Sequence, residues 1–290
     1  MRIACITTSH NRCNYTRTSL KSLKESFYYS KNAKADYYVV DDGSSDGTGD
    51  MIRSEYPDVN LLYGDGNLYW NRGIIFGWET AIRSNNHYDA FFIFNDDTLF
   101  YKDGLKCIIS NLLEASRYNQ NCIAITGSLK DPTGGYTTYG GLVKNPKILS
   151  PLNFKKVDPN GYLIPCDTFN MNCVLVNKNS VEAIGILDKK YHHSFGDLDY
   201  GLRLKKIGGS IFLSTQYVGE CARNYKQSTW LDSSMGRLLR LKKMLDVKGL
   251  PIRERMYYYR RHSGSLWFLY CMLPYLAVLL WNCEVKYLRD

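Results

Sequence analysis

The chain has 290 residues, 44% of them hydrophobic, which is enough for a full core in one sizeable domain with an extension, or in two small domains. The formal net charge is +9, and from Cys221 onward 13 Lys and Arg stand against 5 Asp and Glu, so the body is near neutral and the tail is basic. Nine cysteines without CxxC spacing argue against a zinc site and a disulfide framework, and they indicate a reducing compartment.

The first residues lead directly into an apolar segment without the pattern of a secretory leader, so we expect a cytosolic protein. Short apolar runs then alternate with amphipathic segments. We expect strands at 3–7, 37–40, 60–63 and 91–94, and helices at 14–26, 50–55 and 73–83. This alternation predicts a parallel α/β sheet, whose ligands bind at the carboxyl ends of the strands, where the Asp/Gly/Ser clusters of this chain fall.

From about Cys122 the alternation loosens. We expect a hairpin at 134–141, a short strand at 174–176 and a helix that starts near Asp197 and continues to Ile207. The tail has a basic helical stretch at 237–243, an aromatic and basic cluster at 257–261, and a mostly apolar segment at 265–281 that contains Pro274.

Two acidic segments carry most of the chemistry. The apolar run at 91–94 ends on Asn95, Asp96 and Asp97, and two adjacent carboxylates repel each other unless a cation or hydrogen-bond donors offset their charge. A divalent cation that bridges substrate phosphates would do so, and the alternative is an aspartate that caps the next turn. Asp197 and Asp199 are candidates for a catalytic base, or for helix N-terminal acids worth ~0.3–1 kcal/mol.

The run at 39–48 has the sequence VVDDGSSDGT. It predicts either a nucleotide pocket, in which aspartate accepts from base or ribose donors and loop N–H groups face phosphate, or a strand followed by an Asx-capped helix start. From this run alone, both interpretations stay open.

The order of the motifs resembles family 2 glycosyltransferases of the bacterial polysaccharide-biosynthesis type. In chain order they are ITTSHNR at 6–12, VDDGSSDGT at 40–48, NDD at 95–97, GILD at 185–188, and FGDLD at 195–199 with Arg203 and Gly208 after it. The resemblance covers about residues 1–225. It implies an inverting enzyme with a glycosyltransferase A-type α/β fold, which is a mixed, mostly parallel sheet flanked by helices, here with a C-terminal helical extension.

The resemblance also implies roles for single residues. Nucleotide binding would fall to Thr7, Thr8, Arg12, Asp41, Asp42 and Ser44, with Asp41 or Asp42 holding the base. Asp96 and Asp97 would bind Mg²⁺ or Mn²⁺, with Asp97 the direct ligand. Asp197 would be the catalytic base, supported by Asp199 and Arg203. Candidates for contacts with the donor or acceptor sugar are Trp70, Arg72, Asp167 and His193, although Trp70 also suits the core and His193 the surface.

Three positions depart from the family pattern. Gly196 stands where a glutamate usually precedes the base, and Asn172 stands where a glycine is often found. No histidine occurs at 218–224, where many members supply a further metal ligand.

We therefore expect transfer of a sugar from a UDP- or dTDP-sugar to a hydroxyl of a glycan or a lipid-linked glycan. Two alternatives are a nucleotidyltransferase that forms nucleotide sugars and a non-catalytic protein that binds glycan or nucleic acid. The first would want a glycine-rich loop after the first strand, and residues 8–12 contain no glycine. The second would rest on the basic tail, whose apolar segment suits lipid better than nucleic acid, so we expect no nucleic-acid partner.

We expect a catalytic domain at 1–224, made of a nucleotide-binding half at 1–120 and an acceptor-binding half at 121–224, and an extension at 225–290. As a helix, segment 265–281 would be about 25 Å long, short of a hydrocarbon core of about 30 Å, and we expect Pro274 to break it. The extension would lie peripherally on the inner face of the cell membrane, with Trp267, Trp281 and the tyrosines at headgroup level and the basic residues of 237–261 facing anionic lipid. The alternative is a helix pair packed on the catalytic domain or in an oligomer.

Overall fold

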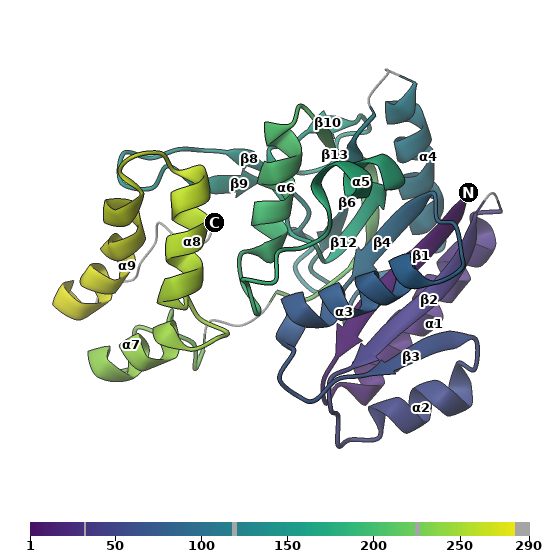
Figure 1. Ribbon diagram of the computed structural model, residues 1–290, viewed down its shortest axis with the longest axis horizontal. Helices are drawn as coiled ribbons and strands as arrows, with labels where there is room; N and C mark the ends of the chain where they lie inside the picture. The colour runs from purple at the N-terminus through teal and green to yellow at the C-terminus, as the bar shows by residue number, and fades with distance from the viewer. Residues whose placement is uncertain (32, 118–120, 224–226, 282–290) are drawn as a thin grey trace.

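The computed structural model describes residues 1–31, 33–117, 121–223 and 227–281. A central sheet is covered by helices on both faces, and a small second sheet connects this body to three C-terminal helices (Figure 1). The domain boundary expected between 224 and 225 lies outside the described residues.

The first half of the main sheet is parallel. β1 pairs with both β2 and β4, and β2 pairs with β3, all in the same direction. These strands are β1 (Arg2–Ser9), β2 (Lys34–Asp41), β3 (Val59–Tyr63) and β4 (Ala90–Phe94). Their carboxyl ends therefore meet at one edge, where the motifs at 6–12, 40–48 and 95–97 lie.

The second half of the sheet is mixed. Across the whole sheet the order is β10-β13-β6-β12-β4-β1-β2-β3, and β12 runs antiparallel to both of its neighbours, whereas β6 and β13 are parallel. The strands are β6 (Ile123–Lys130), β10 (Ile164–Pro165), β12 (Cys173–Asn177) and β13 (Ser210–Glu220), with β5 (Leu99–Phe100) beside β13 and β7 (Thr137–Tyr139) beside β6. The small sheet has the order β11-β8-β9 and consists of β8 (Gly141–Lys144), β9 (Phe154–Lys156) and β11 (Thr168–Phe169).

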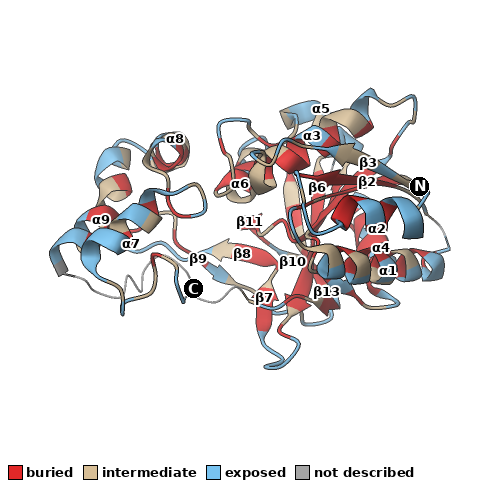
Figure 2. Ribbon diagram, turned by 90° about the horizontal axis from the view of Figure 1, so that it is seen from below, coloured by how far each residue is buried: buried red, intermediate tan, exposed pale blue. Residues whose placement is uncertain are grey.

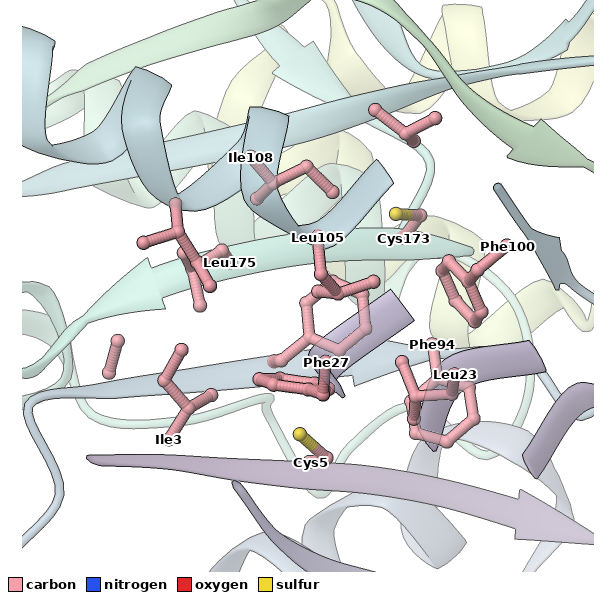
Figure 3. Close-up of a cluster of buried hydrophobic side chains, with 14 of the residues drawn as sticks. Ile3, Cys5, Leu23, Phe27, Phe94, Phe100, Leu105, Ile108, Cys173 and Leu175 are labelled. Carbon is pink, nitrogen blue, oxygen red and sulfur yellow. The ribbon is translucent and has the colours of Figure 1, made fainter. Parts of the chain in front are cut away.

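Two helix layers bury the main sheet. One face is covered by α1 (Cys13–Tyr29), α2 (Thr48–Glu55) and α4 (Gly104–Ser116), and the other by α3 (Tyr69–Arg83), α5 (Lys178–Ile184) and α6 (Gly196–Lys206). Successive residues of β1 point to opposite cores: Ile3 and Cys5 face the first layer (Figure 3), whereas Ala4 and Ile6 face the second. Burial on both faces explains why the strands are continuous apolar runs.

Most of the predicted elements are confirmed, although α1 and α3 are longer than expected and α3 begins at Tyr69. The hairpin predicted at 134–141 is displaced. β6 and β7 pair antiparallel across the turn at 131–136, and β8 leaves this pair to join the small sheet. Gly140, between β7 and β8, has a φ of 150°, which lets the chain turn away there.

The C-terminal helices pack on one another and on the body. They are α7 (Arg237–Leu245), α8 (Ile252–His262) and α9 (Trp267–Trp281). Figure 2 shows buried positions on each of these helices. These positions share a core with the small sheet and with the loop before α6, and this core includes Phe154, Tyr191 and Phe195. This arrangement is the packed alternative, and it directs three of the basic residues expected to face lipid toward the protein instead. Arg240 donates to the Trp230 carbonyl at 3.0 Å, Arg255 is almost fully buried, and Arg261 pairs with carboxylates of the body, so for these three the expectation is wrong.

Helix α9 continues through Pro274, so the predicted break does not occur. Proline has no N–H for the carbonyl of residue 270 and normally interrupts a helix. In this helix, the buried Arg255 guanidinium donates to the carbonyls of Cys271 at 3.0 Å and Tyr270 at 3.4 Å. An arginine from α8 thus replaces the backbone donor that Pro274 lacks.

An outer apolar face remains on these helices. On α7 it comprises Leu238, Leu239 and Leu245. It continues with Leu266, just before α9, and with Phe268, Leu269, Leu276, Leu279 and Leu280 of α9. Among the helices of the described ranges, none is long and apolar enough to cross a membrane. The side chain of Trp281, expected at headgroup level, lies outside the described residues.

We predict that Arg255→Met lowers the free energy of unfolding by about 1.5–3 kcal/mol, because two buried carbonyls lose a charged donor. The loss should be smaller in a Pro274→Ala background, where residue 274 again supplies its own N–H to Tyr270. A double-mutant cycle in urea measures this coupling. An equal loss in both backgrounds would contradict the role assigned to Arg255.

Candidate active site

A cavity of about 830 Å³ opens at the carboxyl edge of the parallel strands. Its walls come from the ends of β1 and β4, the start of α6, the small sheet and the C-terminal helices. Residues that line it include Thr8, His10, Arg12, Asp42, Trp70, Asp96, Asp97, Lys156, His193, Asp197, Trp230 and Tyr258. The extension is therefore a wall of the cavity.

Asp96 and Asp97 follow β4 after one intervening residue, Asn95. Arg12, the N-cap residue of α1, places one guanidinium nitrogen 2.7 Å from Asp97 Oδ2 and another 3.5 Å from Asp96 Oδ1. Burial raises the pKa of Asp96 to about 6. The negative charge of Asp97 also raises this pKa, whereas the positive charge of Arg12 lowers it. Asp96 Oδ2 is buried and has no hydrogen-bond partner among the described residues.

The donor set at this point fits a hard cation. Within the described ranges there is no group of three or more His, Cys, Asp or Glu side chains that could hold a metal ion by itself. Two carboxylates, one with an unsatisfied oxygen, suit a cation whose remaining ligands are water and substrate phosphates. The Arg12 guanidinium lies against the same two carboxylates, so it supplies part of the counter-charge and would adjoin any phosphate bound there.

The run at 39–48 forms a tightly bonded loop. The Asp42 carboxylate accepts from the backbone N–H groups of Gly66 at 2.9 Å and of Leu68 and Tyr69 at 3.0 Å, which fixes the chain before α3. Asp41 Oδ1 accepts from the Ser44 N–H at 3.0 Å, as the Asx alternative predicts.

Of the six residues expected at the nucleotide, three line the cavity, namely Thr8, Arg12 and Asp42. Asp41 and Thr7 are buried behind it, and Ser44 accepts from the Asn11 N–H beside it.

Asp197 lies at the first turn of α6 and lines the cavity. Its carboxylate accepts from the Leu198 N–H at 2.8 Å, and Met171 and the Asn170 side chain also hydrogen-bond to it. Burial nevertheless raises the pKa of Asp197 above its ordinary value. None of the described salt bridges includes this carboxylate, so Asp197 is suited to accept a proton.

Asp199 and Arg203 lie one turn apart on α6, away from the cavity. The Asp199 side chain is fully buried and accepts from Arg203 Nε at 2.8 Å. Burial pushes the pKa of Asp199 up, but the hydrogen bond from His262 and the charges of Arg203 and Arg261 outweigh it and hold this pKa at about 2. Arg261 and His262 belong to α8, and no motif in the sequence points to a role for them at this site.

The space around position 196 explains why a glycine stands there, where the resemblance led us to expect a glutamate. A Cβ atom on Gly196 would overlap the side-chain oxygen of Asn71. The nitrogen of the same Asn71 side chain donates to the carbonyls of Asp188 at 3.0 Å and Tyr191 at 2.8 Å, and so ties α3 to the loop before α6. In this chain, Asn71 occupies the space that a side chain at position 196 would need.

The sugar-contact candidates separate into two groups. Trp70 and His193 line the cavity, and Trp70 both packs on the core and donates from Nε1 to Asn95 Oδ1 at 2.8 Å. Arg72 does not line the cavity. Nor does Asp167, whose carboxylate accepts from the Lys144 N–H at 2.7 Å.

The sequence model described as "Glycosyl transferase family 2" matches residues 4–172. The chain belongs to this family. Membership confirms the enzyme class inferred from the motifs and favours a glycosyltransferase over a nucleotidyltransferase or a non-catalytic binding protein. No curated protein matches the chain.

Solved structures of low sequence identity share the fold. The mannosyltransferase PcManGT from Pyrobaculum calidifontis, in complex with GDP-Man and Mn²⁺, is 16% identical with a TM-score of 0.56, over 97% of this chain and 70% of that one. Residues 1–349 of TarS from S. aureus, in complex with UDP-GlcNAc, are 12% identical with a TM-score of 0.53, over 96% of this chain and 81% of that one. These likenesses confirm the glycosyltransferase A-type fold.

We predict that Gly196→Ala destabilises the protein by about 1–3 kcal/mol, the usual cost of overpacking, because Asn71 must move and its two carbonyl bonds weaken. Gly236→Ala is the matched control, since a Cβ there meets open space and the backbone φ is −61°. Urea unfolding of both variants measures the difference. Equal stabilities would show that Asn71 does not exclude a side chain at position 196.

Proposed function

We propose that the chain transfers a sugar from a nucleotide-diphosphate sugar, a UDP- or dTDP-sugar, to a hydroxyl of a glycan or lipid-linked glycan, with inversion. The observation that supports this most is that one cavity is bordered by two separate acidic centres. Asp96 and Asp97, beside Arg12, suit a diphosphate and its cation, and Asp197, outside any described salt bridge, suits an acceptor hydroxyl.

The donor is assigned to the strand-end side of the cavity. Thr8 and Asp42 line the cavity near the ends of β1 and β2, where we place the nucleoside, and Arg12 lies beside the two carboxylates to which we assign the cation and the diphosphate. The relatives of known structure carry GDP-Man or UDP-GlcNAc, which supports a nucleotide-sugar donor without fixing its base.

Asp97 and Asp96 are assigned to Mg²⁺ or Mn²⁺. Such a cation, when bound, would offset the negative charge that builds on the departing diphosphate. Arg12 contributes to the same end from the protein, because its guanidinium already lies beside both carboxylates.

Asp197 is assigned as the base of a single displacement. Its carboxylate would accept the proton of the acceptor hydroxyl from about 2.6–3.2 Å while that oxygen attacks the anomeric carbon and the diphosphate leaves. The raised pKa makes this carboxylate a stronger base than an exposed aspartate, and its neighbours on the loop and on α6 keep it in place.

We also propose that the extension attaches peripherally to the cytoplasmic face of a membrane. The outer leucines of α7 are accompanied on the same helix by exposed Arg237 and Lys242, and this combination of apolar and basic side chains suits anionic lipid. Such attachment would bring the cavity close to a lipid-linked acceptor.

We predict that Asp97→Ala abolishes the dependence of UDP or dTDP affinity on Mn²⁺ and leaves the unfolding temperature near that of the parent, because the carboxylate lies at a strand end beside the cavity. Calorimetric titration with Mn²⁺ and with EDTA measures the dependence. Asp50→Ala, an exposed aspartate of α2, is the control. A variant that keeps the parent's Mn²⁺ dependence would contradict the cation assignment.

We predict that Asp197→Asn lowers sugar transfer by ~10²–10⁴-fold and leaves donor affinity unchanged, because the amide cannot accept the proton. In the parent, kcat should fall as Asp197 is protonated, with a midpoint above the ordinary aspartate pKa of about 3.9. Asp246→Asn, at an exposed aspartate that also lines the cavity, is the control. Parent-like turnover of Asp197→Asn would move the base elsewhere.

We predict that the full chain floats with anionic liposomes at low salt, and that a Leu269→Glu, Leu276→Glu double variant stays in the soluble fraction. Both leucines are exposed on α9. Leu113→Glu, at an exposed leucine of α4, should float like the parent. Membrane attachment is wrong if the parent itself does not float.

A further inference from the structure

Helix α8 presents one face of an unusual composition. Glu254, Tyr257, Tyr258, Arg261 and His262 recur at the spacing i, i+3, i+4, i+7 and i+8, which places them on a single stripe. A helix that packs on a body normally turns an apolar stripe inward. This stripe is polar and aromatic, and it meets the segment 188–199, which leads into α6 and carries Asp197.

The first half of the stripe holds the loop before α6. Glu254 accepts from the backbone N–H of His192 at 3.2 Å, and its other oxygen lies 2.7 Å from the Nδ1 atom of the same histidine. Tyr257 donates from its hydroxyl to Asp188 Oδ2 at 2.8 Å. Two positions of this loop, Asp188 and His192, are therefore fixed from α8.

The Tyr258 ring stacks on Phe195, with centroids 5.1 Å apart and an interplanar angle of 28°. Phe195 precedes α6 and has a φ of 71°, a left-handed conformation that bulky residues rarely adopt. A strained backbone conformation of this kind persists where the surrounding structure holds it. Here the rings of Tyr258 and Tyr191 both pack against Phe195.

The second half of the stripe holds the helix itself. Arg261 Nη1 lies 2.8 and 3.0 Å from the two oxygens of Asp199, and Arg261 Nη2 lies 2.9 Å from Asp188 Oδ2. His262 Nε2 lies 2.9 Å from Asp199 Oδ1. Asp199 is two residues beyond Asp197 and its side chain is fully buried, so a shift of α8 would leave a buried carboxylate without two of its partners.

We propose that α8 is a positioning element of the catalytic centre, and that Arg261 and His262 are the positioning residues that set the place of Asp197. Asp197 lies between Phe195 and Asp199, and α8 holds both of these neighbours. The extension then completes the active site as well as enclosing it. This inference rests on the proposed role of Asp197 as the base.

The test compares Arg261→Gln with Arg260→Gln in the full-length chain. Arg260 is the exposed neighbour on the opposite side of α8 and makes none of these contacts. Because a misplacement of about 1 Å can cost ~10²-fold in rate, Arg261→Gln should lower the kcat of sugar transfer by about that factor, with the KM and Kd of the donor unchanged. Arg260→Gln should keep the parent's kcat.

A second pair of variants separates positioning from mere folding. His262→Ala removes the donor to Asp199, whereas His262→Gln carries an amide nitrogen that can donate from a similar position. The kcat per folded molecule, with the folded fraction taken from near-UV circular dichroism, should fall in His262→Ala and recover in His262→Gln. A lower unfolding temperature with the parent's kcat per folded molecule in Arg261→Gln and His262→Ala would overturn the proposal.

Asp197→Asn, assayed in parallel, separates two hypotheses, namely that Asp197 is the base and that α8 positions it. An inactive Asp197→Asn beside a fully active Arg261→Gln overturns the positioning role alone. A fully active Asp197→Asn overturns the assignment of the base, whatever the α8 variants do.

Discussion

The buried charge of Asp199 is the constraint on which much of the molecule depends. A carboxylate with no exposed surface is costly unless opposite charges and hydrogen-bond donors surround it. Here the partners come from α6 itself through Arg203, from α8 through Arg261 and His262, and from the loop through Tyr191. Satisfying this one group fixes the extension against the body, and with it the wall of the cavity.

The pKa values of Asp96 and Asp197, which line the cavity, and of Asp199, which lies beside it on α6, differ because their surroundings differ. Burial alone would raise the pKa of each, but the cations around Asp199 hold its pKa at about 2, so it stays ionised as a structural charge. Asp96 has a single arginine and a second carboxylate beside it, and its pKa rises to about 6. Asp197 has hydrogen bonds and no described salt bridge, so its pKa also rises. This separation suits a division of labour between structure, cation binding and proton transfer.

Sequence periodicity was sufficient for the sheet and its helices. The apolar run at 91–94 is buried on both faces, and a parallel sheet brings its aspartates to the same edge as Arg12 and Asp42. The family's motif order located Asp197, which lines the same cavity. In these places a local pattern and the fold-level rule agree, so the sequence was informative.

The sequence could not reveal partners that lie far apart along the chain. The stripe on α8 contains Glu, Tyr, Arg and His, a composition typical of a helix face exposed to solvent or lipid. Only the fold shows that Asp188, Phe195 and Asp199 lie opposite it. Pro274 was expected to break the helix because proline lacks an N–H. The donor that takes its place, Arg255, comes from another helix, so the local sequence could not show that α9 continues. Gly196 looked like a lost glutamate, and only the position of Asn71 explains it.

The central claim is that a single cavity holds the donor diphosphate at Arg12, Asp96 and Asp97, with Asp197 facing the sugar from the other side. A crystal structure of the chain with UDP and Mn²⁺, collected at an energy where manganese scatters anomalously, tests it most directly. The account predicts an anomalous peak between the Asp97 carboxylate and the diphosphate, with Arg12 on the phosphates. Manganese and nucleotide bound away from Asp97 would contradict it.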